Sequence, residues 1–546
     1  MTTTAGATLA RLADLSGGRL VDPGGGTRDA ATVVGSAAIN AADVPSDGMF
    51  MAVPGTRTHG ATFAGRSAGS CVLTDEAGLG ILTADGYRGP VLVVDDCRRW
   101  MGPVAAEIHG HPTRDMTVIG VTGTSGKTTT TYMMEHALLA AAGADGASGG
   151  VGLIGTTGTR INGTAVPTSL TTPEAPTLQA LFARMRDEGV TRVVMEISSH
   201  ALVLGRVRGV AVDVAAFTNL SQDHLDFHPT MEDYFRAKAG LFTDAQDPGR
   251  GPAVPVVCVD DAWGRRLADE LVAAGRAVTT VASRPDHDGE PASWQVTEVT
   301  VSVDGTQRVT VEHDGTRTSF DLALPGDFNV ANAVLGLATL ATAGRVAGTG
   351  DGVAAWAAQL GDVRVPGRMQ AVAGGEVTPD FLALVDYAHK PAAVAAVLRT
   401  LAGHRDRAGH GGRIGIVLGA GGNRDHEKRP LMGAAAAELA DLVIVTDDNP
   451  RDEDPATIRS AVLAGARDAA AERRADSDGP EIREVGDRRS AIRELVGWAR
   501  RGDIVVVAGK GHEKGQIIGD TVVDFDDVAE LAAAIDAGLD GQETES

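Results

Sequence analysis

The sequence is poor in cysteine and in aromatic residues, and it has no excess of positive charge. Its three cysteines, Cys71, Cys97 and Cys258, show neither metal-ligand nor paired-disulfide spacing, which argues against a zinc module or a disulfide framework and suits a reducing compartment. The formal net charge of -23 disfavours nucleic acid as a partner, because affinity for phosphate backbones depends on clustered Lys and Arg. The chain also lacks a signal-like N-terminus and any apolar run of roughly 18 residues, so we expect no membrane span and predict a cytoplasmic location.

The length of 546 residues exceeds what one hydrophobic core can organise. At about 150 residues per domain it predicts three or four domains, and we expect three. The boundaries follow changes in pattern: a small N-terminal α/β domain at 1–112, a central nucleotide-binding domain at 113–350 and a C-terminal domain at 351–546. The predicted fold class is therefore α/β with three domains.

Each predicted domain has its own pattern of strands and helices. The N-terminal domain mixes short strands with Gly/Pro turns and ends in a His-Gly-His-Pro linker at 109–112. The central domain opens with a strand at 117–121 and alternates strands with helices, which predicts a parallel sheet, and residues 299–324 then indicate a β-meander with turns at Asp304-Gly305 and Asp314-Gly315. The C-terminal domain alternates strictly, which predicts a Rossmann-like, doubly wound parallel sheet with strands at 381–385, 413–418, 442–445 and 504–507.

A glycine-containing loop follows the first strand of the central domain. It consists of Gly123, Thr124, Ser125, Gly126, Lys127, Thr128 and Thr129, and a helical pattern comes next. Backbone N–H groups in such a loop and the N-terminus of the following helix hold phosphates. Lys127 would neutralise charge on a transferred phosphoryl group, and the Thr128 hydroxyl would ligate Mg²⁺. Because the strict phosphate-loop pattern has glycine where Val121 stands, a chance glycine turn is the alternative.

Further polar side chains follow other strands of this domain. Glu196 ends a strand, and a carboxylate in that place can hold a metal ion, although a solvated glutamate would give the same pattern. His224 lies in a run at 219–226 that is dense in oxygen and imidazole ligands, so it is a second metal-ligand candidate against the alternative of a structural histidine. Lys238 lies among small and apolar residues of a predicted helix, where an ordinary lysine would pack its stem and expose its head.

Taken together, the motifs resemble those of the Mur ligases and, more distantly, of folylpolyglutamate synthetases. The resemblance covers nearly the whole chain and rests on motifs in the family's order: Gly-Thr-x-Gly-Lys-Thr-Thr at 123–129, Asn-Leu-x-x-Asp-His-Leu-Asp at 219–226, Ala-Lys-x-x-Leu-Phe at 237–242, Asp-Tyr-Ala-His at 386–389 and Asp-Asn-Pro-Arg at 448–451. It implies an ATP-dependent ligase that activates a carboxylate as an acyl phosphate and couples it to an amine. The implied process is synthesis of peptidoglycan precursors, and through it cell-wall biogenesis, cell shape and cell division.

The resemblance also implies roles for individual residues at the nucleotide. The catalytic residues would be Lys127, Glu196, His224 and a carbamylated Lys238. The metal ligands would be Thr128, Glu196, His224 and the carbamylated Lys238. Carbamylation would turn a cation into an anion and so let Lys238 hold a second Mg²⁺. Besides the loop, the residues that would bind ATP are Asn219, Asn329, Asn332, Arg368 and Asp386.

The acceptor implied by the resemblance is UDP-N-acetylmuramoyl-L-alanyl-D-glutamate. The matching positions are Ser36, Thr58, His59, Gly60, Thr171, Thr172, Ser198 and Arg206. The segment at 171–173 would equally suit the start of a helix with proline in its first turn. In the N-terminal domain the sequence departs from the family, since Gly-Ser-Ala at 35–37 replaces the commoner Asp-Ser-Arg.

The amine implied by the resemblance is meso-diaminopimelate. The matching positions are Arg424, Asp448, Asn449, Pro450, Arg451, Gly509 and Glu513. The planar guanidinium of Arg451 can grip a distal carboxylate with two hydrogen bonds, while Glu513 would pair with the distal ammonium. An Asn-Pro turn beside surface charges is the structural alternative. A lysine-adding relative, a folate polyglutamate synthetase and a nucleotide-binding module without chemistry stay open, and a monomer is expected.

Overall fold

The computed structural model forms two compact units. It describes residues 6–25, 30–145, 149–224, 227–287, 289, 291–302, 305–350, 352–375, 378–407, 411–423, 425–473 and 479–543. The first unit comprises Met1–Gln295 and Ala331–Ala357, and the second comprises Val296–Val330 and Ala358–Ser546. Each unit has its own buried clusters of apolar side chains.

A five-stranded sheet organises the N-terminal part of the first unit. Across the sheet the strands are β2 (Arg19–Val21), β7 (Val91–Val93), β6 (Cys71–Thr74), β5 (Gly48–Met51) and β4 (Ser36–Ala38). All neighbours are parallel except β2 and β7. The other elements are β1 (Ala7–Thr8) paired with β3 (Val33–Val34), helices α1 (Leu9–Ser16), α2 (Glu76–Ala84) and α3 (Cys97–Ile108), and short 3-10 helices η1 (Ala41–Asp43), η2 (Gly60–Arg66) and η3 (Pro112–Asp115).

The second sheet of the first unit carries the phosphate loop. Of its eleven strands, those wholly within the first unit are, in spatial order, β11 (Thr164–Val166), β10 (Gly158–Ile161), β9 (Gly150–Gly155), β12 (Val190–Glu196), β8 (Thr117–Thr122), β13 (Val214–Phe217), β14 (Val254–Cys258) and β15 (Thr279–Ala282). The pairs from β9 to β15 are parallel, so the carboxyl ends of these strands share one edge. Its helices are α4 (Lys127–Asp145), α5 (Ala175–Asp187), α6 (Ser199–Val203), α7 (Met231–Thr243) and α8 (Ala262–Ala273).

Helix α9 (Asp327–Ala347) is long and apolar enough to cross a membrane by composition alone, with a mean hydropathy of 1.4 in its most apolar window. That window is 78% buried inside the structure, as in the core helix of a folded domain. The helix is therefore weak evidence for a span. A shorter helix, α10 (Val353–Ala357), follows it.

The second unit begins with the end of one strand and an antiparallel hairpin. Strand β16 (Trp294–Val301) starts in the first unit and is followed by β17 (Gln307–His313) and β18 (Thr316–Leu322). The turn between β17 and β18 consists of Asp314 and Gly315, both with positive φ, as two-residue hairpins require. The hairpin predicted at Asp314-Gly315 is confirmed, whereas Asp304 of the other predicted turn lies outside the described residues.

The C-terminal sheet follows. Its spatial order is β19 (Gln370–Ala371), β20 (Leu382–Asp386), β24 (Ile504–Ala508), β21 (Ile414–Leu418), β22 (Leu442–Val445) and β23 (Glu481–Glu484). Every pair is parallel except that of β19 with β20. The helices are α11 (Pro391–Arg407), α12 (Lys428–Ala437), α13 (Pro455–Arg473), α14 (Arg488–Trp498) and α15 (Asp527–Glu543), and β25 (Gln516–Ile518) pairs with β26 (Thr521–Val523).

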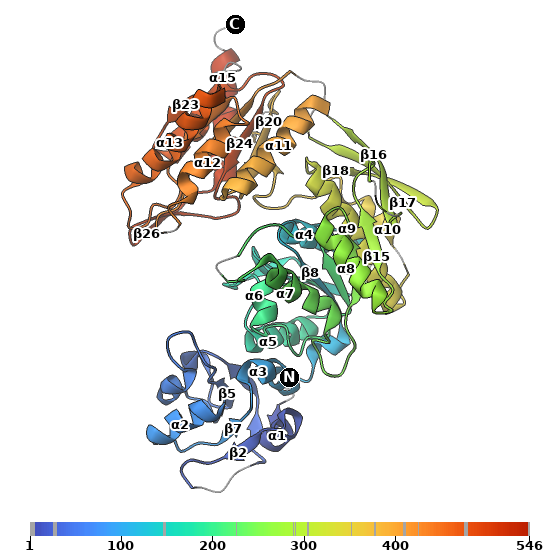
Figure 1. The fold of residues 1–546 in the computed structure, drawn as a ribbon, viewed down its shortest axis with the longest axis vertical. Coiled ribbons are helices and arrows are strands. Elements are labelled where there is room, and N and C mark those ends of the chain that lie inside the picture. Colours follow the sequence, from blue (N-terminus) through green and yellow to red (C-terminus); the bar gives the residue numbers. More distant parts are fainter. Residues whose placement is uncertain are drawn as a thin grey trace. The chain divides into compact units, whose positions relative to one another are not determined.

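Helices cover both faces of this sheet. One buried cluster joins Leu384, Ile416 and Val506 to α11, α12 and α13, which lie over one face in Figure 1. A second cluster joins the alternate strand residues, such as Val417 and Val507, to α14 and α15. Because successive strand residues point to opposite faces, the two clusters define a doubly wound sheet, and all four predicted strands are confirmed.

Candidate active site

The phosphate loop connects the end of β8 to the start of α4. Gly123 and Gly126 have φ of +146° and +88°, a region that side chains rarely adopt. A Cβ on Gly126 would lie 2.2 Å from Oδ1 of Asn332, and a Cβ on Gly123 would lie 1.9 Å from Oγ1 of Thr218. Both positions therefore need glycine. The chance-turn alternative does not explain such close packing of the loop against neighbouring polar side chains.

The loop is held in place from the end of β13. Ser125 N donates to Oδ1 of Asn219 at 3.1 Å, and Nδ2 of Asn219 donates to Ser125 O at 3.1 Å. Thr124 N donates to Asn219 O at 2.9 Å, and the Thr218 hydroxyl donates to Ser125 O at 2.7 Å. Asn219, predicted to bind ATP, thus fixes the conformation of the loop that would do so.

Glu196 reaches the loop from the neighbouring strand β12. Its Oε2 accepts from the Thr128 hydroxyl at 3.0 Å, and the Glu196 side chain is almost fully buried. Oε1 accepts from Thr156 N at 2.8 Å, while the Thr156 hydroxyl donates to Oε2 at 3.1 Å. The structure therefore brings together two of the four predicted metal ligands, Thr128 and Glu196. Thr129, next on α4, is buried.

Two lysines converge on one carbonyl of the loop. Nζ of Lys127 donates to Gly123 O and to Thr124 O, each at 2.9 Å. Nζ of Lys238, from α7, donates to the same Gly123 O at 2.7 Å and lies 4.6 Å from the ring centroid of Tyr234. The Tyr234 hydroxyl in turn lies 3.2 Å from Oγ1 of Thr124. The prediction of an ordinary lysine with an exposed head is wrong, because the Lys238 side chain is buried.

The environment of Lys238 favours its neutral form. Burial, together with repulsion from Lys127, holds the pKa of Lys238 well below its usual range, against a weaker opposing influence of Asp223. A neutral amine is the nucleophilic form of a lysine, and only that form can add to carbon dioxide to give a carbamate. The geometry is thus compatible with the modification that the family resemblance implies.

His224 lies against His200 of α6, the short helix that follows Glu196 in the chain. It has a positive φ of +53°, its Nε2 lies 3.6 Å from Oδ2 of Asp223, and its ring lies edge-on to His200 with 4.9 Å between centroids. His228, buried nearby, lies 2.9 Å from the Ser199 hydroxyl through its Nε2. Within the described residues, no three His, Cys, Asp or Glu side chains form a cluster that could hold a metal ion.

The predicted acceptor-binding residues of the central domain gather at the end of β12. The Thr172 hydroxyl donates to Glu196 O at 2.9 Å and accepts from Ser198 N at 3.3 Å. Arg206 donates to Thr172 O at 3.2 Å and pairs with Glu174, and the Thr171 hydroxyl lies 3.2 Å from that of Thr156. A cavity of about 550 Å³ opens beside them, lined by Ile39, Pro167, Thr168, Ser169, Leu170, Pro173, Glu174 and Thr177.

The predicted acceptor-binding residues of the N-terminal sheet lie in two places. Ser36 belongs to the edge strand β4, and its buried Oγ has no hydrogen-bond partner among the described residues. Thr58, His59 and Gly60 follow β5, where Nδ1 of His59 accepts from Ala61 N at 3.1 Å and so caps η2. His59 therefore has a structural role, whatever else it contacts.

In the second unit, Asp386 ends β20 and lies close to Arg368. Its carboxylate accepts from Met369 N and Ala388 N, each at 2.8 Å. Burial raises the pKa of Asp386 above its usual value, although the Arg368 charge and these two amides act in the opposite direction. Asn329, also predicted to bind ATP, is buried and donates to Pro325 O at 2.8 Å.

The predicted amine-binding residues form a buried network after β22 and β24. Asn449 donates to Oε2 of Glu513 at 3.1 Å and accepts from Lys510 at 3.0 Å, and Nζ of Lys510 lies 3.6 Å from Asp448. Lys510 is fully buried; it lies in the candidate run at 509–513, but the sequence assigns it no role of its own.

Arg451 lies beside this network with a positive φ of +53°. Its NH1 donates to Gly422 O at 2.8 Å, and its backbone N donates to Ile517 O at 3.0 Å. Pro450 precedes it and is buried. Arg424, the second predicted carboxylate contact, lies outside the described residues. The site therefore gathers Asp448, Asn449, Gly509 and Glu513 at the carboxyl ends of two parallel strands.

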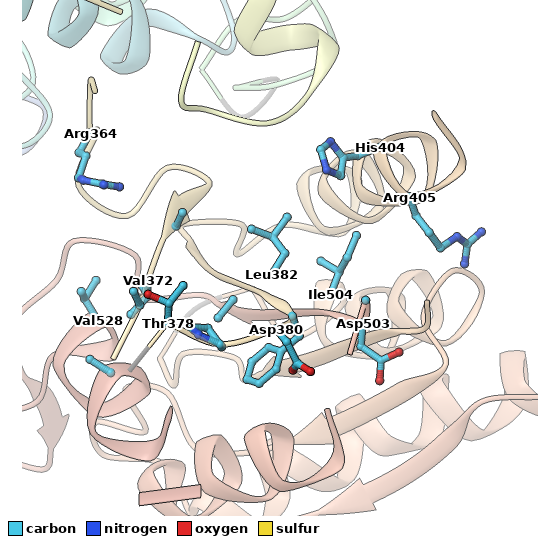
Figure 2. A pocket seen from close by; sticks show the side chains of 17 residues that line it. Arg364, Val372, Thr378, Asp380, Leu382, His404, Arg405, Asp503, Ile504 and Val528 are labelled. Atoms are coloured by element: carbon cyan, nitrogen blue, oxygen red, sulfur yellow. The ribbon is translucent and has the colours of Figure 1, made fainter. Parts of the chain in front are cut away.

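A separate cavity of about 490 Å³ lies at the amino ends of strands of the same sheet (Figure 2). Its lining includes Leu382 and Ile504, the first residues of β20 and β24, with His404 from α11 and Val528 from α15. Because ligands of open parallel sheets bind beyond the carboxyl ends of strands, this cavity is distinct from the predicted amine site.

Comparison with known proteins agrees with this geometry. The Mur ligase middle domain matches residues 121–340, and the Mur ligase glutamate ligase domain matches residues 367–511. The UDP-N-acetylmuramoyl-L-alanyl-D-glutamate--2,6-diaminopimelate ligase of Corynebacterium glutamicum is 54% identical over 502 residues, which cover 91% of this chain and 90% of that protein. The ligase of the same name from Streptomyces avermitilis is 45% identical over 496 residues, 90% of each chain.

A solved structure of a UDP-N-acetylmuramoyl-L-alanyl-D-glutamate--2,6-diaminopimelate ligase is also similar. It is 28% identical in sequence, covers 97% of this chain and 99% of its own, and superposes with a TM-score of 0.66. The predicted resemblance and the predicted mixed α/β fold with parallel sheets are both confirmed. This chain therefore belongs to the Mur ligase family, whose members are ATP-dependent ligases that form carbon–nitrogen bonds.

Proposed function

We propose that this chain is an ATP-dependent ligase that adds meso-2,6-diaminopimelate to UDP-N-acetylmuramoyl-L-alanyl-D-glutamate during synthesis of peptidoglycan precursors. The observation that carries the proposal is 54% identity to a ligase of that name over 91% of this chain. The folded phosphate loop and the network around Asn449 support it, because they supply a place for ATP and a place for a charged amine. Residues 1–112 would bind the uridine end, 113–350 ATP, and 351–546 the amino acid.

The reaction would proceed in two transfers. A carboxylate oxygen of D-glutamate attacks the γ-phosphorus of ATP, ADP leaves, and an acyl phosphate forms. The diaminopimelate amine then attacks the acyl carbon, loses a proton and expels phosphate. The N-terminus of α4 and Lys127 would stabilise charge on the transferred phosphoryl group, as the loop positions both at one point.

The oxygen atoms of Thr128 and Glu196 suit Mg²⁺. They lie 3.0 Å apart at the start of α4, and hydroxyl and carboxylate oxygens are the ligands that this hard cation prefers. His224 and a carbamylated Lys238 complete the proposed metal-binding set. When bound, Mg²⁺ would neutralise phosphate charge and polarise the phosphoryl oxygens. Mg²⁺ is thus the proposed cofactor and ATP the cosubstrate.

The remaining assignments extend this proposal. ATP would be bound by Gly123 to Thr129 with Asn219, Asn329, Asn332, Arg368 and Asp386. The acceptor would be bound by Ser36, Thr58, His59, Gly60, Thr171, Thr172, Ser198 and Arg206. Diaminopimelate would be bound by Arg424, Asp448, Asn449, Pro450, Arg451, Gly509 and Glu513. We also propose a cytoplasmic location, which suits three buried free cysteines, and a monomeric state.

Phosphate release with the muramoyl dipeptide and a panel of amines tests the proposal. Diaminopimelate should give the highest kcat/KM, and Lys127→Ala should release no phosphate above background, because the loop loses the one lysine that would neutralise charge on the transferred phosphoryl group. Lysine outperforming diaminopimelate would overturn the amine assignment. Turnover with a folate and glutamate in place of both substrates would overturn the acceptor assignment.

A further inference from the structure

Tyr387 touches both the proposed nucleotide arginine and the proposed amine-site glutamate. It follows Asp386 at the end of β20. The guanidinium carbon of Arg368 lies 4.6 Å from its ring centroid, within the range of a cation–π interaction. On the other side, its hydroxyl donates to Oε1 of Glu513 at 3.4 Å. One side chain therefore joins two residues assigned to different substrates.

The backbone around Tyr387 leaves little room for independent movement. A Cβ on Gly367, which has a φ of +61°, would lie 2.2 Å from the carbonyl carbon of Gly511. A Cβ on Gly511, which has a φ of +56°, would lie 2.8 Å from Cβ of Tyr387. The loop that bears Arg368, the ring of Tyr387 and the loop that bears Glu513 are thus packed directly on one another.

His512 completes this packing. Its ring centroid lies 5.2 Å from that of Tyr387, and its buried Nδ1 has no hydrogen-bond partner among the described residues. Burial, with repulsion from Arg368, lowers the pKa of His512 to about 4, so the ring is neutral at pH 7. A neutral ring can pack against Tyr387 without adding a second cation beside Arg368.

The connection continues from Glu513 into the amine-binding residues. Oε2 of Glu513 accepts from Asn449, and Oδ1 of Asn449 accepts from the buried Lys510. A shift of the Tyr387 ring that follows Arg368 would therefore reach the Asp448 to Arg451 segment through hydrogen bonds rather than through solvent.

We propose that Tyr387 is a positioning residue that couples nucleotide binding at Arg368 to amine binding at Glu513. The inference rests on the proposed function for the identity of the two ligands. Nucleotide phosphates draw the Arg368 guanidinium, the Tyr387 ring beneath it follows, and the Tyr387 hydroxyl positions Glu513 for the amine's ammonium. By thermodynamic reciprocity, bound amine then tightens nucleotide binding by the same factor.

Two substitutions separate the two contacts of Tyr387. Tyr387→Phe removes only the hydroxyl that reaches Glu513, whereas Tyr387→Leu removes the ring beneath Arg368 as well. Tyr87→Phe, at a tyrosine of the N-terminal sheet domain, is the matched control. The dissociation constant of diaminopimelate is measured by calorimetry with the muramoyl dipeptide present, with and without a non-hydrolysable ATP analogue, and the affinity for the analogue is measured likewise.

In the parent, the analogue should tighten diaminopimelate binding about 5-fold or more. Tyr387→Phe should weaken diaminopimelate binding about 3- to 10-fold and bring this coupling factor close to one, with affinity for the analogue alone unchanged. Tyr387→Leu should also weaken binding of the analogue itself. Tyr87→Phe should leave every value unchanged.

The inference is overturned if Tyr387→Phe keeps the parent's coupling factor, or if it weakens both ligands equally without changing that factor, as a purely structural role would predict. A parent that ligates no amine in the phosphate-release assay would instead overturn the proposed function. Binding of the ATP analogue can be measured even if the parent has no ligase activity. In that case, equal affinity of Tyr387→Leu and of the parent for the analogue would by itself overturn the inference.

Discussion

Replacement of Lys238 by methionine should raise stability while abolishing activity. The Lys238 side chain is 1% exposed, and its Nζ donates a hydrogen bond to Gly123 O, an acceptor that Lys127 also uses. Burial and the Lys127 charge lower the pKa of Lys238 well below its usual range. Folding therefore disfavours the charged form of this side chain, and methionine, of similar length, has no charge to disfavour.

The sign and size of the effect follow from linkage. In the unfolded chain the Lys238 amine has a pKa of about 10.4, and folding lowers this pKa. The lowered pKa destabilises the folded protein, and this free-energy penalty is complete below the folded-state pKa and vanishes above the unfolded-state pKa. Replacing buried charged groups by apolar ones of similar volume stabilises proteins by about 1–4 kcal/mol, and the lost bond to Gly123 O offsets about 1 kcal/mol of this. We expect a net gain of up to about 3 kcal/mol at pH 7, or up to roughly 10 °C in the melting temperature.

Scanning calorimetry in carbon-dioxide-free buffer without nucleotide, from pH 6.5 to 9.5, measures this gain. Lys127→Met is the matched control: Lys127 shares the Gly123 acceptor but is only partly buried, so its replacement relieves only the repulsion on Lys238, and its melting temperature should rise less than that of Lys238→Met. Neither variant should release phosphate. The reasoning is refuted if Lys238→Met melts below the parent at pH 7, or if its gain stays constant as the pH rises.

Three further substitutions probe the loop, the metal ligands and the amine site. Gly126→Ala should weaken binding of an ATP analogue at least about 10-fold, because its Cβ would lie 2.2 Å from Oδ1 of Asn332 at a φ of +88°; Gly80→Ala, in open space on α2, is the control, and equal affinities in titration calorimetry would contradict the geometry. Glu196→Gln should lower kcat for phosphate release about 100-fold or more and raise the Mg²⁺ requirement, since an amide carries no charge for the cation; a parent-like Mg²⁺ titration would remove Glu196 from the metal site. Arg451→Lys should raise KM for diaminopimelate about 10- to 100-fold with KM for ATP unchanged, because an ammonium cannot make the paired contact, and an unchanged KM in the phosphate-release assay would contradict the assigned contact.

The sequence predicted strands best where both faces are buried. The run at 504–507 became β24 because an uninterrupted series of Ile and Val suits only a strand covered on both sides. Strand β23, with the sequence EIRE, was not predicted, since an exposed edge strand carries charges and shows no apolar run. The two-residue strand β19 is too short to leave any pattern.

The sequence predicts that the site residues follow the ends of strands, but it does not predict which side chains or backbone atoms they contact. Glu196 and Asp448 were found because polar residues at carboxyl ends of parallel strands meet at one edge. The burial of Lys238 could not be foreseen, because its acceptor, Gly123 O, lies 115 residues away in the chain. Thr156 was likewise missed, because its partner Glu196 is fixed only by tertiary packing.

Isotope transfer from substrate to phosphate tests the proposed chemistry most directly. The muramoyl dipeptide, labelled with ¹⁸O in both oxygens of the D-glutamate side-chain carboxylate, is incubated with ATP, Mg²⁺ and diaminopimelate, and the phosphate and the peptide are analysed by mass spectrometry. We predict one ¹⁸O atom in each phosphate released and one retained in the new amide of a diaminopimelate-containing product. Unlabelled phosphate, or labelled phosphate without such a product, would contradict an acyl-phosphate ligase specific for diaminopimelate.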